Sequence, residues 1–277
     1  MSPLAAVPVG QPGDRGPLEP AQAPDAHRAP AAHDLPEDAL TRLRALGLRP
    51  ITPPGLDPAL AIWLGNLDDA GLASRAQRLD AAEQQRMQRF RFAQDRSRFA
   101  ATRVLLRALL GEICHRPPQA MDWLEGAFGK PALRPGSGPH FNVSHCDSTL
   151  LIATNARRPV GVDVEAATRL ADEALPDLAE RCFSPRELHA FRTAPAAQRR
   201  LLFLQTWTRK EACLKALGSG LSIEPQVFDA GPAGLRASVN IPVGAGVAQM
   251  VVDPVPIEGH GTAAVSVLDE ASLGWAR

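Results

Sequence analysis

Lysine is almost absent from this sequence of 277 residues, because 27 of its 30 basic residues are arginine and only three are lysine. Tyrosine is absent altogether. The simplest explanation is a compositional bias that replaces lysine with arginine wherever either residue will serve. The two side chains are not interchangeable where a compact ammonium must contact phosphate or a proton-transfer centre. The bias therefore suggests that Lys130, Lys210 and Lys215 stand where arginine does not serve.

The sequence also lacks an excess of charge, since its 30 basic residues balance 30 acidic ones. A neutral total disfavours binding to nucleic acid through bulk charge. No apolar run approaches the ~18 residues of a membrane span. Residues 1–10 lack the basic start and apolar stretch of a secretory signal. We therefore expect neither a nucleic-acid partner nor a membrane partner.

Cysteine is scarce, and its four occurrences form no C-x-x-C pair. The seven histidines do not lie at zinc-site spacing beside them. A disulfide framework and a zinc site are both disfavoured, and reduced thiols in a cytoplasmic protein are expected.

The chain divides into a tail and two halves. Residues 1–58 hold 12 of the 26 prolines and few large apolar side chains. Such a segment buries too little surface to offset its ordering entropy, so we expect a disordered Pro/Ala-rich tail, with one short helix possible at 37–46. Mixed helix and strand patterns follow in an N-terminal half, 59–158, and a C-terminal half, 159–277.

Hydrophobic periodicity predicts the elements of both halves. Asp80 with Glu83 forms a capping-box pattern at the start of the first long helical region, which has a break near residues 92–95. The expected elements are a strand at 60–64, helices within 80–111, strands at 140–143, 149–153 and 160–165, helices at 175–182, 185–192 and 196–217, and short strands from 221 to 268.

Two carboxylates stand together in the sequence V-G-V-D-V-E at 160–165. Side chains alternate along a strand, so Asp163 and Glu165 share one face with Gly161, ~7 Å apart. Like charges this close are unfavourable unless something neutralises them. Mg²⁺ suits two oxygen ligands with space left by the glycine. The alternative is an exposed strand edge with solvated acids.

A second cluster lies in W-T-R-K-E-A-C-L-K at 207–215. Trp207, Glu211 and Lys215 share one helix face, because they are spaced by four residues. An ordinary helix ion pair between Glu211 and Lys215 is the simpler interpretation. Against it, two of the three lysines of the chain lie in this segment.

Two further segments suggest phosphate binding. Arginine dominates one side of the helical region 86–107, which is either a solvated face or an anion site. Ser144, His145 and Asp147 follow a predicted strand, but they are too close in sequence to form a catalytic triad, and no G-x-S-x-G elbow occurs. Ser144 and His145 at a strand end could instead donate to phosphate oxygens.

These segments resemble the paired signature of the Sfp-type 4′-phosphopantetheinyl transferases. The V-G-V-D strand is followed, 44 residues from Asp163 to Trp207, by the W-T-R-K-E-A-C-L-K helix. G-K-P at 129–131 and F-N-V-S-H at 141–145 precede them in the family's order. The resemblance covers roughly residues 60–268.

The resemblance implies an α+β pseudodimer of two similar halves with coenzyme A bound between them. It implies transfer of the 4′-phosphopantetheine arm of coenzyme A to a serine of an apo acyl or peptidyl carrier protein, with release of 3′,5′-ADP. The cofactor would be Mg²⁺, and a monomer is expected because the two halves already pair. A coenzyme A-binding or carrier-binding module without catalysis is the alternative, disfavoured because the full acidic set is present. An unrelated Mg²⁺-dependent nucleotide enzyme is disfavoured because no G-x-x-x-x-G-K-S/T loop occurs.

The resemblance also assigns roles to residues. The metal ligands would be Asp163, Glu165 and Glu211. Glu211 would take the proton of the incoming serine, directly or through a metal-bound water, with Glu187 as a second candidate, and Lys215 would neutralise developing charge. Contacts to coenzyme A would come from Arg86, Arg98, Lys130, Pro131, Ser144, His145, Asp163 and Lys215. Glu83 departs from the family, since some relatives place a basic residue there.

Overall fold

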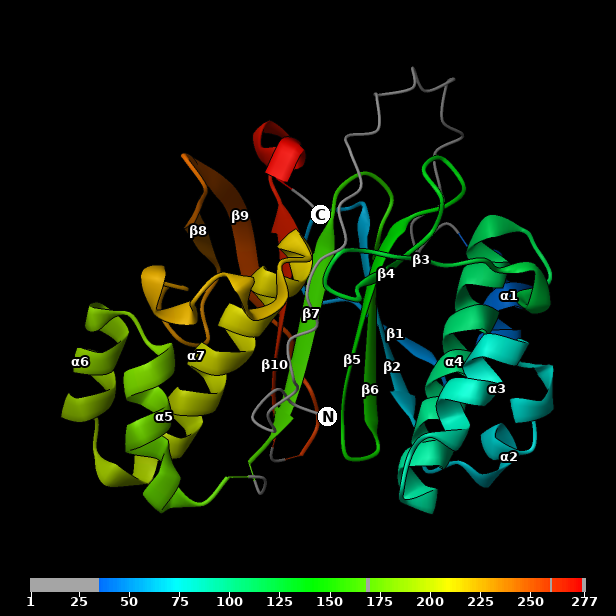
Figure 1. Cartoon of the computed structure of the whole chain (residues 1–277), viewed down its shortest axis with the longest axis horizontal. Coiled ribbons are helices and arrows are strands. Elements are labelled where there is room, and N and C mark those ends of the chain that lie inside the picture. Colours follow the sequence, from blue (N-terminus) through cyan, green and yellow to red (C-terminus); the bar gives the residue numbers. More distant parts are fainter. Residues whose placement is uncertain (1–34, 168–169, 260, 276–277) are drawn as a thin grey trace.

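The protein is a four-layered α+β structure, helix on sheet against sheet on helix (Figure 1). The computed structural model describes residues 35–167, 170–259 and 261–275. Each half contributes one four-stranded antiparallel sheet and one helix of 22 residues that covers its outer face. The predicted fold of two similar α+β halves is confirmed.

The first half carries the sheet order β1-β2-β6-β5. Its long helix α4 begins after a break at residues 89–92, close to the break that the sequence predicts. The elements are α1 (Glu37–Arg44), β1 (Arg49–Ile51), β2 (Leu60–Asn66), α2 (Ala70–Ala73), α3 (Ala81–Gln88), α4 (Ala93–Cys114), β3 (Leu124–Glu125), β4 (Pro131–Ala132), β5 (His140–Cys146) and β6 (Thr149–Asn155).

The second half carries the sheet order β7-β10-β9-β8. Helix α7 has the bounds that the sequence predicts, and Gly218 ends it in the left-handed conformation. The elements are β7 (Val160–Ala166), α5 (Leu175–Cys182), α6 (Pro185–Thr193), α7 (Ala196–Leu217), β8 (Ala237–Val243), β9 (Gly246–Pro254) and β10 (Gly261–Leu268).

The predicted tail is shorter than the expected range of 1–58. Residues 37–51 form α1 and β1, and β1 pairs with β2 at the edge of the first sheet. The physical reason is that Ala39, Leu43 and Leu48 are fully buried in the same core as α4, which offsets the ordering entropy. Residues 1–34, the rest of that predicted tail, lie outside the described residues.

Separate apolar clusters hold the layers together. One lies between the first sheet and α4, and a second between α7 and the second sheet. A third lies between the two sheets and contains Val160, Val162 and Val164 of β7. The valines of V-G-V-D-V-E therefore face the other half, and the alternate residues face α7. No helix among the described residues is long and apolar enough to cross a membrane.

Candidate active site at the junction of the two halves

The two carboxylates of β7 are buried, so the alternative of a solvated strand edge is wrong. Asp163 is 3 % exposed and Glu165 is 8 % exposed. The role expected for Gly161 is also wrong, because its free side leaves no room for an ion. A Cβ atom added there would lie 2.0 Å from the carbonyl oxygen of Ala212 and 2.3 Å from the amide nitrogen of Ala216. The glycine lets α7 approach β7, which brings the acids against the helix.

Helix α7 places Glu211 and Lys215 against those acids. The Nζ atom of Lys215 lies 2.6 Å from Oδ1 of Asp163. Lys215 therefore pairs with a strand carboxylate, in place of the ordinary helix ion pair with Glu211. Burial lowers the pKa of Lys215, but Asp163 and Glu211 more than offset this, and the pKa lies above its usual value. The ammonium is consequently a fixed positive charge within the acidic cluster.

Glu211 is the titratable acid of the cluster. Burial raises its pKa to about 7; Lys215 opposes the rise, while the charges of Asp163 and Glu165 add to it. A carboxyl with this pKa exchanges protons readily near neutral pH.

Asp163 has one carboxylate oxygen, Oδ2, that is buried without a hydrogen-bond partner. A buried carboxylate oxygen of this kind is expected to gain a partner when the site is used.

Strand β5 supports β7 through its side chains. These two strands form adjacent edges of the two sheets, and alternate β5 residues contact β7. Oδ1 of Asn142 accepts the amide hydrogen of Val162, and Oγ of Ser144 donates to Oδ1 of Asp163 at 2.9 Å. Ser144 also accepts from Lys215 at 3.1 Å. Ser144, predicted to contact coenzyme A, thus lies inside the acidic cluster.

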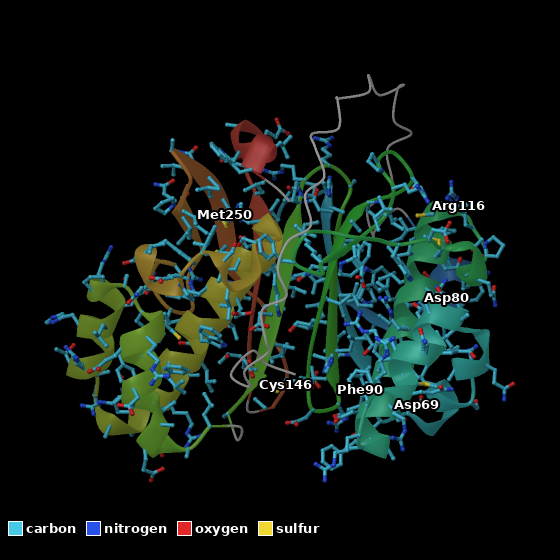
Figure 2. The ribbon with its side chains drawn as sticks, in the orientation of Figure 1. Asp69, Asp80, Phe90, Arg116, Cys146 and Met250 are labelled. Atoms are coloured by element: carbon cyan, nitrogen blue, oxygen red, sulfur yellow. The ribbon has the colours of Figure 1, made fainter. Side chains whose placement is uncertain are left out.

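The next inward-facing residue of β5, Cys146, continues this pattern. Its thiol lies 3.9 Å from Oε2 of Glu165, and its sulfur accepts the amide hydrogen of Ala166. Cys146 lies between the two halves in Figure 2. Asn142 and Cys146 were missed by sequence reasoning. The available signal was their spacing by two from Ser144, which places all three on one face of the strand.

Glu187 and Lys210 form a separate buried pair. Lys210 is fully buried, and its Nζ lies 2.7 Å from Oε2 of Glu187. It also donates to the carbonyl oxygens of Pro225 and Phe228. Oε1 of Glu187 accepts from the amide of Ala230. These contacts occupy both oxygens of Glu187, which argues against its role as a second proton acceptor.

The acids of the site are not a preformed metal cage. Among residues 35–167, 170–259 and 261–275, no three His, Cys, Asp or Glu side chains are gathered closely enough to hold a metal ion. Lys215 compensates part of the negative charge. The donors nevertheless have the right chemistry, since Mg²⁺ prefers carboxylate oxygens.

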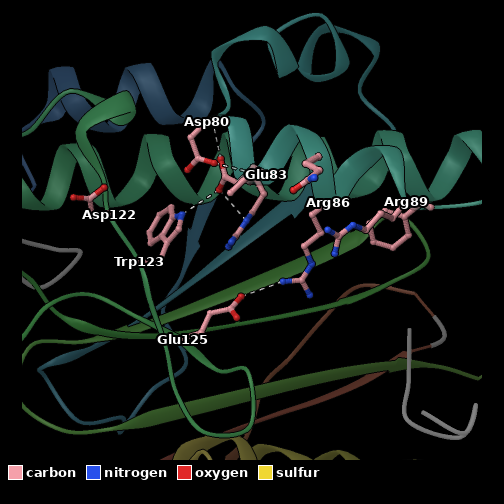
Figure 3. A pocket seen from close by; sticks show the side chains of 11 residues that line it. Asp80, Glu83, Arg86, Arg89, Asp122, Trp123 and Glu125 are labelled. Atoms are coloured by element: carbon pink, nitrogen blue, oxygen red, sulfur yellow. Dashed lines mark hydrogen bonds and ion pairs between the residues drawn. The ribbon is translucent and has the colours of Figure 1, made fainter. Parts of the chain in front are cut away.

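The arginine-rich region borders a pocket of about 780 Å³ next to α3 and β3 (Figure 3). Arg86 lines it and makes an ion pair of 3.3 Å with Glu125. Arg98 lies outside this lining and makes two hydrogen bonds to Asp68. The structure thus gives the two arginines different acidic partners.

Glu83, for which the sequence resemblance suggests a basic residue in some relatives, faces inward. Its carboxylate is 4 % exposed and is paired with Arg103 and Arg107. It completes the predicted capping box with Asp80 and accepts from the indole of Trp123. The negative charge is therefore neutralised within the first half and does not oppose an anion at Arg86.

Lys130 joins the two halves beside a second pocket, of about 530 Å³, which Pro131 and His140 also line. The Nζ of Lys130 donates to the carbonyl oxygens of Val160 and Ala216, each at 3.1 Å. Burial lowers its pKa to about 7. An anion in this pocket would restore the charged form of the ammonium.

Together, the fold and the site define a two-halved α+β protein with an acidic centre at the junction and cationic side chains on its nucleotide-sized pockets. Comparison with known proteins specifies the class. Residues 68–157 match the family described as 4′-phosphopantetheinyl transferase, N-terminal, and residues 159–237 match the 4′-phosphopantetheinyl transferase superfamily. The two matches meet where β6 crosses to β7.

Individual relatives agree. The chain is 34 % identical over 229 residues to the 4′-phosphopantetheinyl transferase HetI of Nostoc, covering 79 % of this chain and 91 % of that protein. It is 31 % identical to a 4′-phosphopantetheinyl transferase of Bacillus pumilus, covering 61 % of this chain and 72 % of the relative. The human L-aminoadipate-semialdehyde dehydrogenase-phosphopantetheinyl transferase is 29 % identical, with coverages of 62 % and 59 %. The chain belongs to the 4′-phosphopantetheinyl transferase family, which transfers phosphopantetheine from coenzyme A to carrier proteins.

Proposed function

We propose that this chain performs the family's transfer at the junction of β5, β7 and α7, as a Mg²⁺-dependent monomer in the cytoplasm. The acceptor would be a serine of an apo acyl or peptidyl carrier protein, and 3′,5′-ADP would leave. The observation that supports this most strongly is the convergence of Asp163, Glu211 and Lys215 in one buried cluster. Burying like charges together is costly, which favours a functional origin.

Asp163, Glu165 and Glu211 would hold Mg²⁺, and because they are not a preformed cage, binding of the ion would have to draw their carboxylates together. The open Oδ2 of Asp163 favours a cation here, and so does the raised pKa of Glu211, which is caused first by burial and then by repulsion from Asp163 and Glu165. When bound, the ion would screen the negative pyrophosphate of coenzyme A and lower the pKa of a coordinated water.

Glu211 is the proposed proton acceptor for the carrier serine. With a pKa of about 7, it is partly ionised at neutral pH and matched to proton transfer. The serine oxygen would bond to the phosphorus that carries the pantetheine arm, and the serine proton would pass to Glu211, directly or through water. The bond from that phosphorus to the oxygen that bridges the two phosphates of coenzyme A would break, and 3′,5′-ADP would leave. Lys215, held by Asp163 and Ser144, is placed to meet the charge that develops on the phosphate groups.

The remaining residues would bind the coenzyme. We propose that Arg86 and Arg98 contact its 3′-phosphate, that Lys130 and Pro131 flank the nucleotide, and that His145 contacts a phosphate. Lys130 and Pro131 line the pocket between β4, β5 and the second half. Ser144 acts within the acidic cluster through its contacts to Asp163 and Lys215.

The test mixes the protein with coenzyme A, Mg²⁺ and a broad panel of apo carrier proteins, and measures the intact mass of each carrier. We expect a phosphopantetheine adduct on at least one carrier, no adduct with Asp163→Ala, and full activity with the exposed control Glu37→Gln. Coenzyme A binding without any adduct across the panel would favour a non-catalytic binding module. Normal turnover by Asp163→Ala would contradict the metal site.

A further inference from the structure

Arginine and aromatic side chains alternate in a row beside the pocket at α3 and α4, and three members of this row, Arg86, Arg103 and Trp123, line the pocket. The guanidinium carbons of Arg86 and Arg103 each lie 5.8 Å from the ring centre of Phe99. Arg103 and Arg107 lie 5.2 and 5.0 Å from Trp123. The order of the stack is Arg86, Phe99, Arg103, Trp123, Arg107, and these distances are within the range of cation–π attraction.

Burial increases steadily from one end of this stack to the other. The side chain of Arg107 is 3 % exposed, that of Arg103 is 13 % exposed and that of Arg86 is 58 % exposed. Glu83 pairs with both buried arginines, and Asp80 supplies the second negative charge through its ion pair with Arg107. The stack is therefore anchored by ion pairs in the core, and Arg86 is its most exposed arginine, in the pocket that Arg89 also lines (Figure 3).

Arg86 has weak support apart from this stack. Its ion pair with Glu125 is 3.3 Å long, and the partner is 65 % exposed, so solvent screens it. An arginine side chain loses rotamer entropy when a ligand immobilises it. A ring face that already restricts the guanidinium reduces that cost on binding. Phe99 supplies the face, and Phe90 packs against it with ring centres 5.3 Å apart.

We propose that Phe99 is a positioning residue that orients Arg86 toward the 3′-phosphate and thereby sets the preference for coenzyme A over its 3′-dephospho form. Phe99 acts through Arg86 and does not itself touch the phosphate. This inference rests on the proposed role of Arg86. Arg103 extends the same support, because its guanidinium also lies 5.8 Å from the centre of the Phe99 ring and is held by Glu83.

The experiment compares KM and kcat for coenzyme A and for 3′-dephospho-coenzyme A, with the same apo carrier protein and the full chain. Phe99→Leu and Phe99→Met keep an apolar side chain but remove the aromatic ring. Phe99→Tyr keeps the ring and serves as the conservative variant. Phe92→Leu is the matched control, since Arg91 also lies over Phe92, at 5.4 Å, but this ring is 61 % exposed and its arginine does not line the pocket that Arg86 lines.

We expect Phe99→Leu and Phe99→Met to lower the ratio of kcat/KM for the two substrates about two- to five-fold, the size of an exposed cation–π contact. The lower ratio should come from a higher KM for coenzyme A with little change in kcat. Phe99→Tyr should keep the ratio of the unsubstituted protein. An unchanged ratio in both variants, or a fall as large in Phe92→Leu, would overturn the proposal. Arg86→Ala distinguishes the proposed phosphate contact of Arg86 from the proposed positioning role of Phe99. If Arg86→Ala leaves the ratio unchanged, the phosphate contact of Arg86 is wrong. If Arg86→Ala lowers the ratio and the Phe99 variants do not, only the role of Phe99 is wrong.

Discussion

The substitution Gly161→Ala tests whether close contact between β7 and α7 builds the active site. The new Cβ would lie 2.0 Å from the carbonyl oxygen of Ala212, 2.3 Å from the amide nitrogen of Ala216 and 2.9 Å from the carbonyl carbon of Lys215. All three are backbone atoms of one helix, so no rotamer change can relieve the overlap. An ordinary contact begins at 3.4 Å, and α7 must therefore move away by more than 1 Å.

Two consequences follow from that movement. Overpacking of this kind costs typically about 1–3 kcal/mol of unfolding free energy, partly offset because alanine is favoured over glycine in a strand by roughly 0.5–1 kcal/mol. The movement also carries Glu211 and Lys215 away from Asp163. Since a displacement of about 1 Å can reduce a catalysed rate about 100-fold, we expect the larger effect on turnover.

Gly65→Ala provides the matched control, because Gly65 also lies in a strand against a 22-residue helix. Its added Cβ would meet only the side-chain ends of Leu105 and Leu150, at 3.3 Å, and these can adjust. Urea unfolding and initial transfer rates of both variants test the argument. If Gly161→Ala unfolds at the same urea concentration as Gly65→Ala and transfers at the unchanged rate, the close-contact explanation is refuted.

Three further predictions follow from the charged groups. Lys210→Met should destabilise the protein by about 3–5 kcal/mol because it leaves the buried Glu187 unpaired, and the urea midpoint of Lys210→Met with Glu187→Gln should recover part of the loss. Burial lowers the pKa of Lys130 from its ordinary 10.5 to about 7 in the folded protein, so between these pH values the unfolded chain binds more protons and the unfolding free energy should rise with pH. Lys130→Met should reduce this rise, measured as the change in urea midpoint from pH 7 to 10. Lys215→Arg keeps the charge but replaces the compact ammonium between Ser144 and Asp163, so the transfer rate should fall about 10-fold or more, and an unchanged rate would contradict this geometry.

Local patterns predict the parts of the site that lie on one element. Strict alternation places the valines of β7 toward the other sheet and its acids on the opposite face, as the structure confirms. The spacing of Glu211 and Lys215 and the bounds of α7 are equally local. The capping box at Asp80 also follows from four consecutive residues. In each case the physical cause is a periodicity or a terminus that the chain carries within itself.

Contacts between elements do not follow from such patterns. Sequence spacing places Asp163 on a face, but it does not reveal that Lys215 and Ser144 contact its Oδ1. Glu83 is similar, because its partners Arg103 and Arg107 lie on the next helix. The ordering of residues 35–58 depends likewise on burial of Leu43 and Leu48 in a core supplied by α4 and the first sheet. Composition alone therefore favours disorder where long-range packing produces structure.

The three lysines show how the structure changes an inference drawn from composition. Lys130 and Lys210 each donate to two backbone carbonyl oxygens, and Lys215 lies between a carboxylate and a hydroxyl. A compact ammonium has three donors that can rotate to meet convergent acceptors, and each of these lysines uses at least two of them. Because Lys210 faces Glu187 while its neighbour Glu211 faces β7, only Glu211 of this adjacent pair lies in the candidate active site. Acceptors of the protein itself therefore account for the contacts of all three ammonium groups, and contact with phosphate is not required to explain their positions.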